Sequence, residues 1–196
     1  MTRTTSKLIL VTGGARSGKS EFAEQFAEHL VGENAAVASL AYIATAQIFD
    51  DEMKQRVRLH QARRSSIWFT AEAPFEAHLT LRQVAQHCDV ILFDCLTLYL
   101  SNLLLAPDAP ADDEQHLASV LGQIDQLIGA CRESNKTVIL VTNEVGMGIV
   151  PENALARKYR DWSGWVNQKV AQAADQVYLV VSGIPVEIKR LAGELN

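Results

Sequence analysis

Eight consecutive residues near the start of the chain form its clearest chemical motif, with the spacing G-x-x-x-x-G-K-[ST]. They are Gly13, Gly14, Ala15, Arg16, Ser17, Gly18, Lys19 and Ser20. Glycines let backbone N–H groups turn inward around phosphate oxygens, and the helix that follows adds its positive amino-terminal end. Lys19 is expected to reach the β- and γ-phosphates, and the Ser20 hydroxyl to join the shell of Mg²⁺. The motif therefore predicts a site for a nucleoside triphosphate with Mg²⁺.

Such a site also needs an acid at the end of a neighbouring strand, where it orients the water shell of the metal. Asp94 closes the apolar run VILFD and is the candidate for this role, including as a metal ligand. The alternative is an ordinary strand-end acid that caps the next helix. Asp89 precedes the same run, so it is expected at the opposite edge of the sheet.

A histidine among arginines is the second candidate for chemistry. Arg56, His60 and Arg64 recur every four residues on one face of a helix predicted over residues 50–64, and Arg63 lies beside them. Such a stripe can bind a triphosphate, and the neighbouring cations lower the pKa of the imidazole, which must be neutral to act as a nucleophile. The alternative is a partly buried packing histidine with solvated arginines. The other histidines are expected in surface helices or at helix ends: His29, His78, His87 and His116.

These residues must be positioned by short apolar runs that alternate with longer helical patterns. The predicted strands span 8–11, 40–44, 90–94, 138–142 and 177–181, with IWFT at 67–70 as a weaker candidate. Several runs are apolar without alternation, which is typical of strands buried on both faces of a parallel sheet. The predicted helices span 20–31, 50–64, 114–133 and 152–174. This alternation predicts an α/β fold of three layers around a mostly parallel central sheet. Residues 184–196 are too weakly patterned to place.

Two further segments follow predicted strands. Thr45, Ala46 and Gln47 end the second strand, and Asn143 and Glu144 follow the strand at 138–142. In a parallel sheet both segments lie at the carboxyl edge, where ligands bind. We therefore expect Thr45, Ala46 and Gln47 beside the phosphate loop, and Asn143 and Glu144 at the same edge of the sheet.

Bulk composition limits the remaining possibilities. The 196 residues suit one domain over 1–196, with residues 1–7 as a flexible tail. A net charge of −5 gives no general attraction to nucleic acid. No run approaches the roughly 18 apolar residues of a membrane span. Three widely spaced cysteines indicate a reducing compartment, and we expect a cytoplasmic protein.

Taken together, four blocks resemble the family of adenosylcobinamide kinase/adenosylcobinamide-phosphate guanylyltransferases. The blocks are VTGGARSGKS from residue 11, YIATAQIFDDEM from residue 42, DCLT from residue 94 and NEVGMGIVP from residue 143. The similarity runs from about residue 8 to about residue 189, and the last block and the histidine-helix spacing are its specific parts.

The resemblance implies a RecA-like P-loop domain that assembles as a homotrimer, with GTP or ATP and a corrinoid as its small-molecule substrates. One histidine of the family carries a covalent GMP, and His60 occupies the matching position. The GTP contacts implied by motif are residues 13–20, 45–47, Gln61, Ala62, Arg63, Arg64, Glu72 and Asp94. Asp94 stands where relatives can carry glutamate, so its role as metal or guanosine ligand stays open.

The implied reaction has two parts: phosphorylation of the aminopropanol hydroxyl of adenosylcobinamide, and transfer of GMP through His60 to give adenosylcobinamide-GDP. Three alternatives are another small-molecule kinase without covalent guanylylation, a RecA-like motor ATPase, and a nucleotide-binding module without turnover. Trp162 and Trp165 leave their helix open to two interpretations, a corrinoid or subunit contact or packing in the core.

Overall fold

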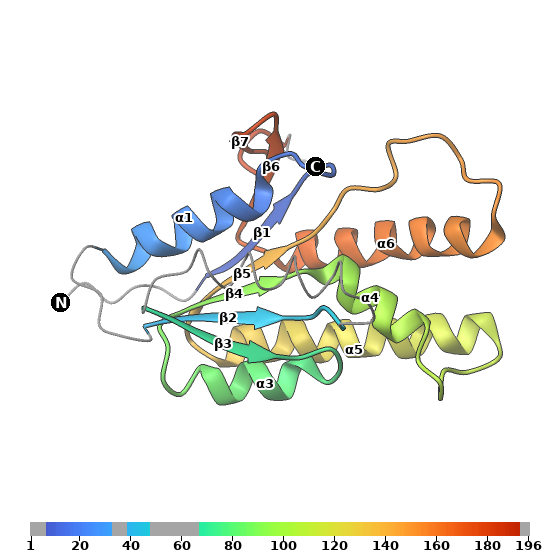
Figure 1. The fold of residues 1–196 in the computed structure, drawn as a ribbon, viewed down its shortest axis with the longest axis horizontal. Coiled ribbons are helices and arrows are strands. Elements are labelled where there is room, and N and C mark those ends of the chain that lie inside the picture. Colours follow the sequence, from blue (N-terminus) through green and yellow to red (C-terminus); the bar gives the residue numbers. More distant parts are fainter. Residues whose placement is uncertain (1–6, 33–38, 48–66, 193–196) are drawn as a thin grey trace.

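The computed structural model describes residues 7–32, 39–47 and 67–192. A sheet of seven strands runs through this part of the chain in the order β3-β2-β4-β5-β1-β6-β7 (Figure 1). The strands are β1 (Leu8–Thr12), β2 (Leu40–Ala44), β3 (Trp68–Glu72), β4 (Val90–Asp94), β5 (Thr137–Val141), β6 (Gln176–Val181) and β7 (Ile184–Glu187). All neighbouring strands are parallel except β6 and β7. The prediction of a mostly parallel sheet is confirmed.

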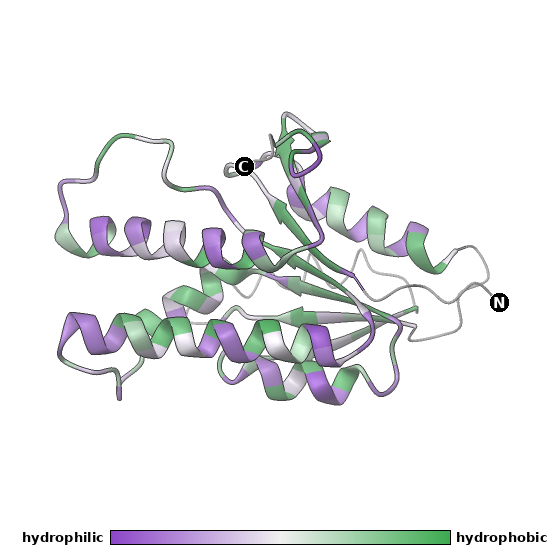
Figure 2. Cartoon of the chain, turned by 180° about the vertical axis from the view of Figure 1, so that it is seen from behind, coloured by the Kyte–Doolittle hydropathy of each residue, from purple (hydrophilic) through white to green (hydrophobic). Residues whose placement is uncertain are grey.

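Helices cover both faces of the sheet. They are α1 (Lys19–Val31), α3 (Ala77–Val84), α4 (Leu96–Leu104), α5 (Asp113–Glu133) and α6 (Ala154–Ala173). Ala23 and Ala27 of α1 belong to one buried cluster with strand residues, whereas α3, α4, α5 and α6 contribute to a second one. Figure 2 shows the strands as mostly hydrophobic and the helices as hydrophobic on part of their surface only. This arrangement confirms the three layers. No helix in the described ranges is both long and apolar enough to cross a membrane.

Three elements were not predicted from the sequence: α3, α4 and β7. Helix α4, with the sequence LTLYLSNLL, buries residues on more than one side, so it shows no single apolar stripe. Strand β7 lies in the segment that could not be placed. It is reached by a two-residue turn in which Ser182 and Gly183 have φ values of 51° and 81°. Positive φ at both positions matches the right-handed twist of paired strands.

His116 corrects one expectation. It was expected in a surface helix or at a helix end; it lies in the first turn of α5, but it is only 5% exposed. Its Nε2 lies 3.1 Å from the carbonyl oxygen of Leu103, and its ring packs edge-on against Trp162 at 4.9 Å between centroids. The burial results from the packing of α5 against α4 and α6, which the pattern of α5 alone does not reveal.

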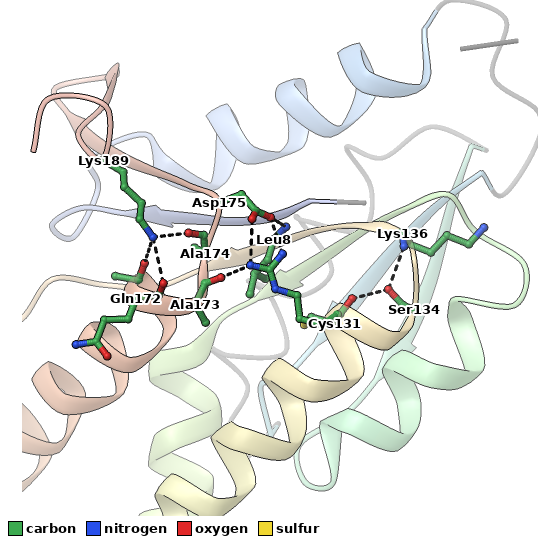
Figure 3. Close-up of polar contacts among 11 residues, drawn as sticks. Leu8, Cys131, Ser134, Lys136, Gln172, Ala173, Ala174, Asp175 and Lys189 are labelled. Carbon is green, nitrogen blue, oxygen red and sulfur yellow. Dashed lines mark hydrogen bonds and ion pairs between the residues drawn. The ribbon is translucent and has the colours of Figure 1, made fainter. Parts of the chain in front are cut away.

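At the amino end of β1, a carboxylate joins three elements (Figure 3). Oδ2 of Asp175 accepts hydrogen bonds from the backbone N–H of Leu8 and from Arg132, both at 2.7 Å. The hydrogen bonds from Arg132 lower the pKa of the Asp175 carboxyl. Close by, Lys189 donates to the last carbonyls of α6, where a cation is favourable. Asp175 thus ties β1 to α5 at the start of β6.

Replacing Asp175 with alanine should lower the free energy of unfolding by about 1–3 kcal/mol, because the buried N–H of Leu8 loses its acceptor. Asp175→Asn is the matched control. Its amide oxygen can still accept from Leu8, so only the exposed ion pair is lost, at about 1 kcal/mol or less. Urea unfolding at neutral pH measures both. Because the pKa of the Asp175 carboxyl is lower in the folded protein than its ordinary value, its negative charge stabilises the fold at neutral pH. This stabilisation is lost as the pH falls through the folded pKa. Equal losses in both variants would contradict this account.

Candidate nucleotide site

The loop between β1 and α1 is packed against the β6–β7 turn. A Cβ on Gly13 would lie 2.5 Å from the carbonyl oxygen of Val180 and 2.6 Å from Oγ of Ser17. Gly18 has a φ of 92°, and its Cβ would lie 3.1 Å from Cα of Gly183. The N–H of Gly183 donates to the Ser17 carbonyl at 2.8 Å. The loop therefore needs glycine at positions 13 and 18 even before a phosphate is considered.

Gly13→Ala should lower the free energy of unfolding by about 1–3 kcal/mol, the range for overpacking a filled site. Gly14→Ala is the matched control, because a Cβ there meets nothing within 4 Å. Its effect should stay within about 0.5 kcal/mol. Urea unfolding without nucleotide measures both, so ligand contacts play no part. Similar stabilities for the two variants would show that the loop is not packed as described.

Lys19 lies at the first position of α1 with its side chain turned back over the loop. It is 9% exposed, and its Nζ donates to the carbonyl of Gly14 at 3.2 Å. Burial lowers the pKa of the Lys19 ammonium, and the charge of Asp94 acts in the opposite direction. Thr12 Oγ1 and Ser17 Oγ are buried without a hydrogen-bond partner in the described part of the chain. The cradle thus holds a buried cation and spare hydroxyls, which suits a polyanion.

Two carboxylates end the strands on either side of β2, at the same edge of the sheet. Ala44, the last residue of β2, pairs with Asp94 on one side and Glu72 on the other. Asp94 is half-buried and its Oδ2 accepts a hydrogen bond from Tyr42 Oη at 3.1 Å. It does not cap the next helix, because Cys95 is the N-cap of α4 and no side chain bonds there. The structure therefore brings Asp94 near Lys19. Glu72 is exposed and ends β3, two strands away from Asp94 in the sheet.

Thr45 acts mainly on the backbone beside Asp94. The side chain is fully buried, and Oγ1 exchanges hydrogen bonds of 2.9 Å with both the N–H and the carbonyl of Cys95. Its carbonyl accepts from Asn102 at 2.8 Å. Ala46 and Gln47 follow, half-buried, at the same edge. Thr45 fixes the end of β4, and the nucleotide contacts of residues 45–47 stay predictions.

The helix predicted over residues 50–64 lies outside the described residues. This range includes His60 and its neighbours Gln61, Ala62, Arg63 and Arg64. Their roles therefore stay predictions as well.

The two tryptophans of α6 differ in burial, which bears on the choice between core packing and a contact surface. Trp162 is 5% exposed and packs on His116, with the ammonium of Lys158 at 4.6 Å from its ring. Trp165 is 46% exposed. Trp162 is thus a packing residue, whereas Trp165 remains available for contact.

Sequence reasoning placed Asn143 at the carboxyl edge but missed the side chains that hold it. Thr97 and Asn167 are both hydrogen-bonded to Asn143, although they come from α4 and α6. The one available signal was the polar Asn167 beside the buried Val166, in the stripe of α6 that faces the core.

Mg²⁺ fits the residues that the sequence proposed for it. Ser20 and Asp94 supply a hydroxyl and a carboxylate, which are oxygen ligands of the kind that Mg²⁺ prefers. Within the described ranges no group of three or more His, Cys, Asp or Glu could hold a metal alone.

Comparison with known proteins decides the family. The model of the cobinamide kinase / cobinamide phosphate guanyltransferase family matches residues 9–188. The chain belongs to this family. Its reaction class is that of a bifunctional cobinamide kinase and guanylyltransferase in adenosylcobalamin biosynthesis.

Curated members of the family align over nearly their full length. The bifunctional adenosylcobalamin biosynthesis protein CobU of Salmonella typhimurium is 49% identical over 93% of this chain and 99% of its own. CobU of Escherichia coli is 45% identical with the same coverage. CobP of Pseudomonas aeruginosa is 41% identical over 92% of this chain and 96% of its own.

A solved structure supports the fold alone. A KaiC-like protein of Pyrococcus horikoshii matches with a TM-score of 0.51 at 13% identity, covering 89% of this chain and 71% of that one. The prediction of a RecA-like P-loop fold is confirmed.

Proposed function

We propose that this cobinamide kinase/guanylyltransferase works in two steps on one nucleotide site. It first phosphorylates the aminopropanol hydroxyl of adenosylcobinamide with a nucleoside triphosphate. It then transfers GMP from GTP to that phosphate, giving adenosylcobinamide-GDP. The observation that carries the proposal is the buried Lys19 in a phosphate loop beside Asp94, within a chain of this family.

The kinase step is a problem of positioning and charge, because phosphoryl transfer leaves the protein little covalent chemistry. The backbone of residues 13–18 and the start of α1 hold the phosphates, and Arg16 is exposed at the rim. Lys19 is held inside the loop, so it stabilises charge that develops toward the β,γ-bridge with little reorganisation. The hydroxyl oxygen bonds to the γ-phosphorus, and the bond to the nucleoside diphosphate breaks.

The guanylyl step needs a nucleophile. The His60 imidazole attacks the α-phosphorus of GTP, pyrophosphate leaves, and GMP stays on the protein as a phosphoramidate. The phosphate of the corrinoid then takes the GMP and regenerates the imidazole. Arg63 and Arg64, with their forked donors, would bind phosphate oxygens during this transfer.

Ser20 and Asp94 would hold Mg²⁺, which when bound neutralises the triphosphate in both steps. Residues 45–47, Gln61, Ala62 and Glu72 would complete the GTP site. The assembly proposed from the family resemblance is a homotrimer. A reducing cytoplasm suits Cys88, Cys95 and Cys131, which are all buried and form no disulfide in the described part of the chain.

The test supplies adenosylcobinamide with ATP, and then with GTP, and follows the products by mass spectrometry. We expect adenosylcobinamide phosphate first, and adenosylcobinamide-GDP with pyrophosphate once GTP is present. A single polynucleotide-stimulated ATPase activity, with the corrinoid unchanged, would support the motor alternative instead. Phosphorylation without any GDP adduct would leave a simple small-molecule kinase.

A further inference from the structure

Asn143 lies between the two halves of the nucleotide site. Strand β5 separates β4, which ends in Asp94, from β1, which leads into the phosphate loop. Val141 pairs with Asp94 of β4 on one side and with Val11 of β1 on the other. Asn143 comes two residues after Val141, just beyond the carboxyl end of β5. The next residue is fixed to the loop, because the N–H of Glu144 donates to the Gly13 carbonyl at 3.0 Å.

The side chain of Asn143 is held from one side of the sheet. Its Nδ2 donates to Oγ1 of Thr97 at 2.9 Å, and Thr97 is 4% exposed at the start of α4. The backbone carbonyl of Asn143 accepts a hydrogen bond from Nδ2 of Asn167 at 3.1 Å, while Oδ1 of Asn167 accepts one from the hydroxyl of Thr142 at 2.7 Å. Tyr159 donates to the carbonyl of Thr97 at 3.2 Å. These part-buried hydrogen bonds restrain the position of Asn143 from two helices.

The network leaves one polar atom of Asn143 for a ligand. The amide nitrogen is engaged with Thr97, and Oδ1 has no hydrogen bond among the residues that the structure describes. Asn143 is half-buried, so it is accessible at the sheet edge. An amide oxygen accepts hydrogen bonds, and phosphate oxygens do the same. Of the two reacting groups in phosphoryl transfer to an alcohol, only the attacking hydroxyl can donate.

We infer that Asn143 Oδ1 accepts a hydrogen bond from the alcohol of the corrinoid and holds its oxygen toward the γ-phosphate. Thr97 and Asn167 are positioning residues: Thr97 fixes the side-chain amide of Asn143, and Asn167 fixes its backbone. The inference deepens the kinase half of the proposed function and rests on it. The new bond joins the alcohol oxygen to the γ-phosphorus, the nucleoside diphosphate leaves with the electron pair of the broken bond, and the proton passes to solvent. Asn143 stays neutral and orients only.

The first test compares Asn143→Ala with wild type in both half-reactions. We expect the kcat of cobinamide phosphorylation to fall about tenfold to a hundredfold, the scale of a misplaced reacting group. Formation of enzyme–GMP from GTP without corrinoid involves no alcohol, so it should change by less than about threefold. An unchanged kinase kcat, or an equal fall in both half-reactions, would overturn the inference.

Two conservative substitutions of Thr97 distinguish a loss of positioning from a loss of folding. Thr97→Val removes the acceptor for Nδ2, so kinase kcat should fall several-fold while the KM for nucleotide stays within about twofold. Thr97→Ser keeps a hydroxyl and should restore kcat. A merely structural network predicts instead that both variants change the midpoint of thermal unfolding and leave kcat per folded enzyme unchanged. If wild type forms no enzyme–GMP, the guanylyl proposal fails, but the kinase comparison still decides the role of Asn143.

Discussion

Lys19→Ala should lower the turnover of cobinamide phosphorylation by at least about a hundredfold, the loss typical of removing one preorganised charge or donor from a transition state. The reason is its place: Lys19 is buried in the loop, with Nζ on the Gly14 carbonyl and Asp94 near enough to influence its pKa. A buried ammonium held in advance stabilises phosphoryl charge without the reorganisation that water requires. Steady-state kinetics with adenosylcobinamide and ATP provides the measurement.

Two further variants separate charge from packing. Lys19→Met keeps an apolar stem in the same space, so it should lose turnover as Lys19→Ala does but unfold closer to wild type. Lys169→Ala removes a lysine that pairs with Asp125 on the surface, and it should leave turnover unchanged. Near-normal turnover of folded Lys19→Met would contradict the assignment of the phosphate loop.

His60→Ala should abolish labelling of the protein by GTP carrying ³²P in its α-phosphate, and with it the formation of adenosylcobinamide-GDP. Phosphorylation of adenosylcobinamide should persist, because the alcohol attacks the γ-phosphate directly and needs no imidazole. The arginines around position 60 would still attract nucleotide, and some loss of kinase rate is expected from less precise positioning. Protein labelling is measured by counting ³²P after gel separation without acid. Phosphorylation of adenosylcobinamide is measured in a separate kinase assay.

His87→Ala is the control, because His87 is exposed near the amino end of β4, away from the nucleotide edge. It should label normally. If His60→Ala still forms a GMP adduct, another residue is the nucleophile. If both activities vanish in a folded variant, His60 is a shared binding element and the division of labour between the two steps is wrong.

Local chemistry explains what the sequence could predict. Residues 13–20 join a buried strand to an amphipathic helix, and strand ends in a parallel sheet share one edge, so the loop and Asp94 could be brought together without coordinates. The tertiary contacts could not be predicted. Helix α4 has no single apolar stripe. The role of Thr97 depends on its hydrogen bond with Asn143, which lies 46 residues away in sequence. Likewise, the close fit of Gly13 to the Val180 carbonyl depends on a strand near the other end of the chain.

We propose that one chain both phosphorylates a corrinoid and carries GMP on His60. The most direct test incubates wild-type protein with GTP and Mg²⁺, digests it under alkaline conditions that preserve a phosphoramidate, and locates the GMP by peptide mass spectrometry. We expect GMP on the peptide that contains His60, and we expect it to be lost when adenosylcobinamide phosphate is added. GMP on a different residue, or adenosylcobinamide-GDP formed with no protein adduct at any time, would contradict it.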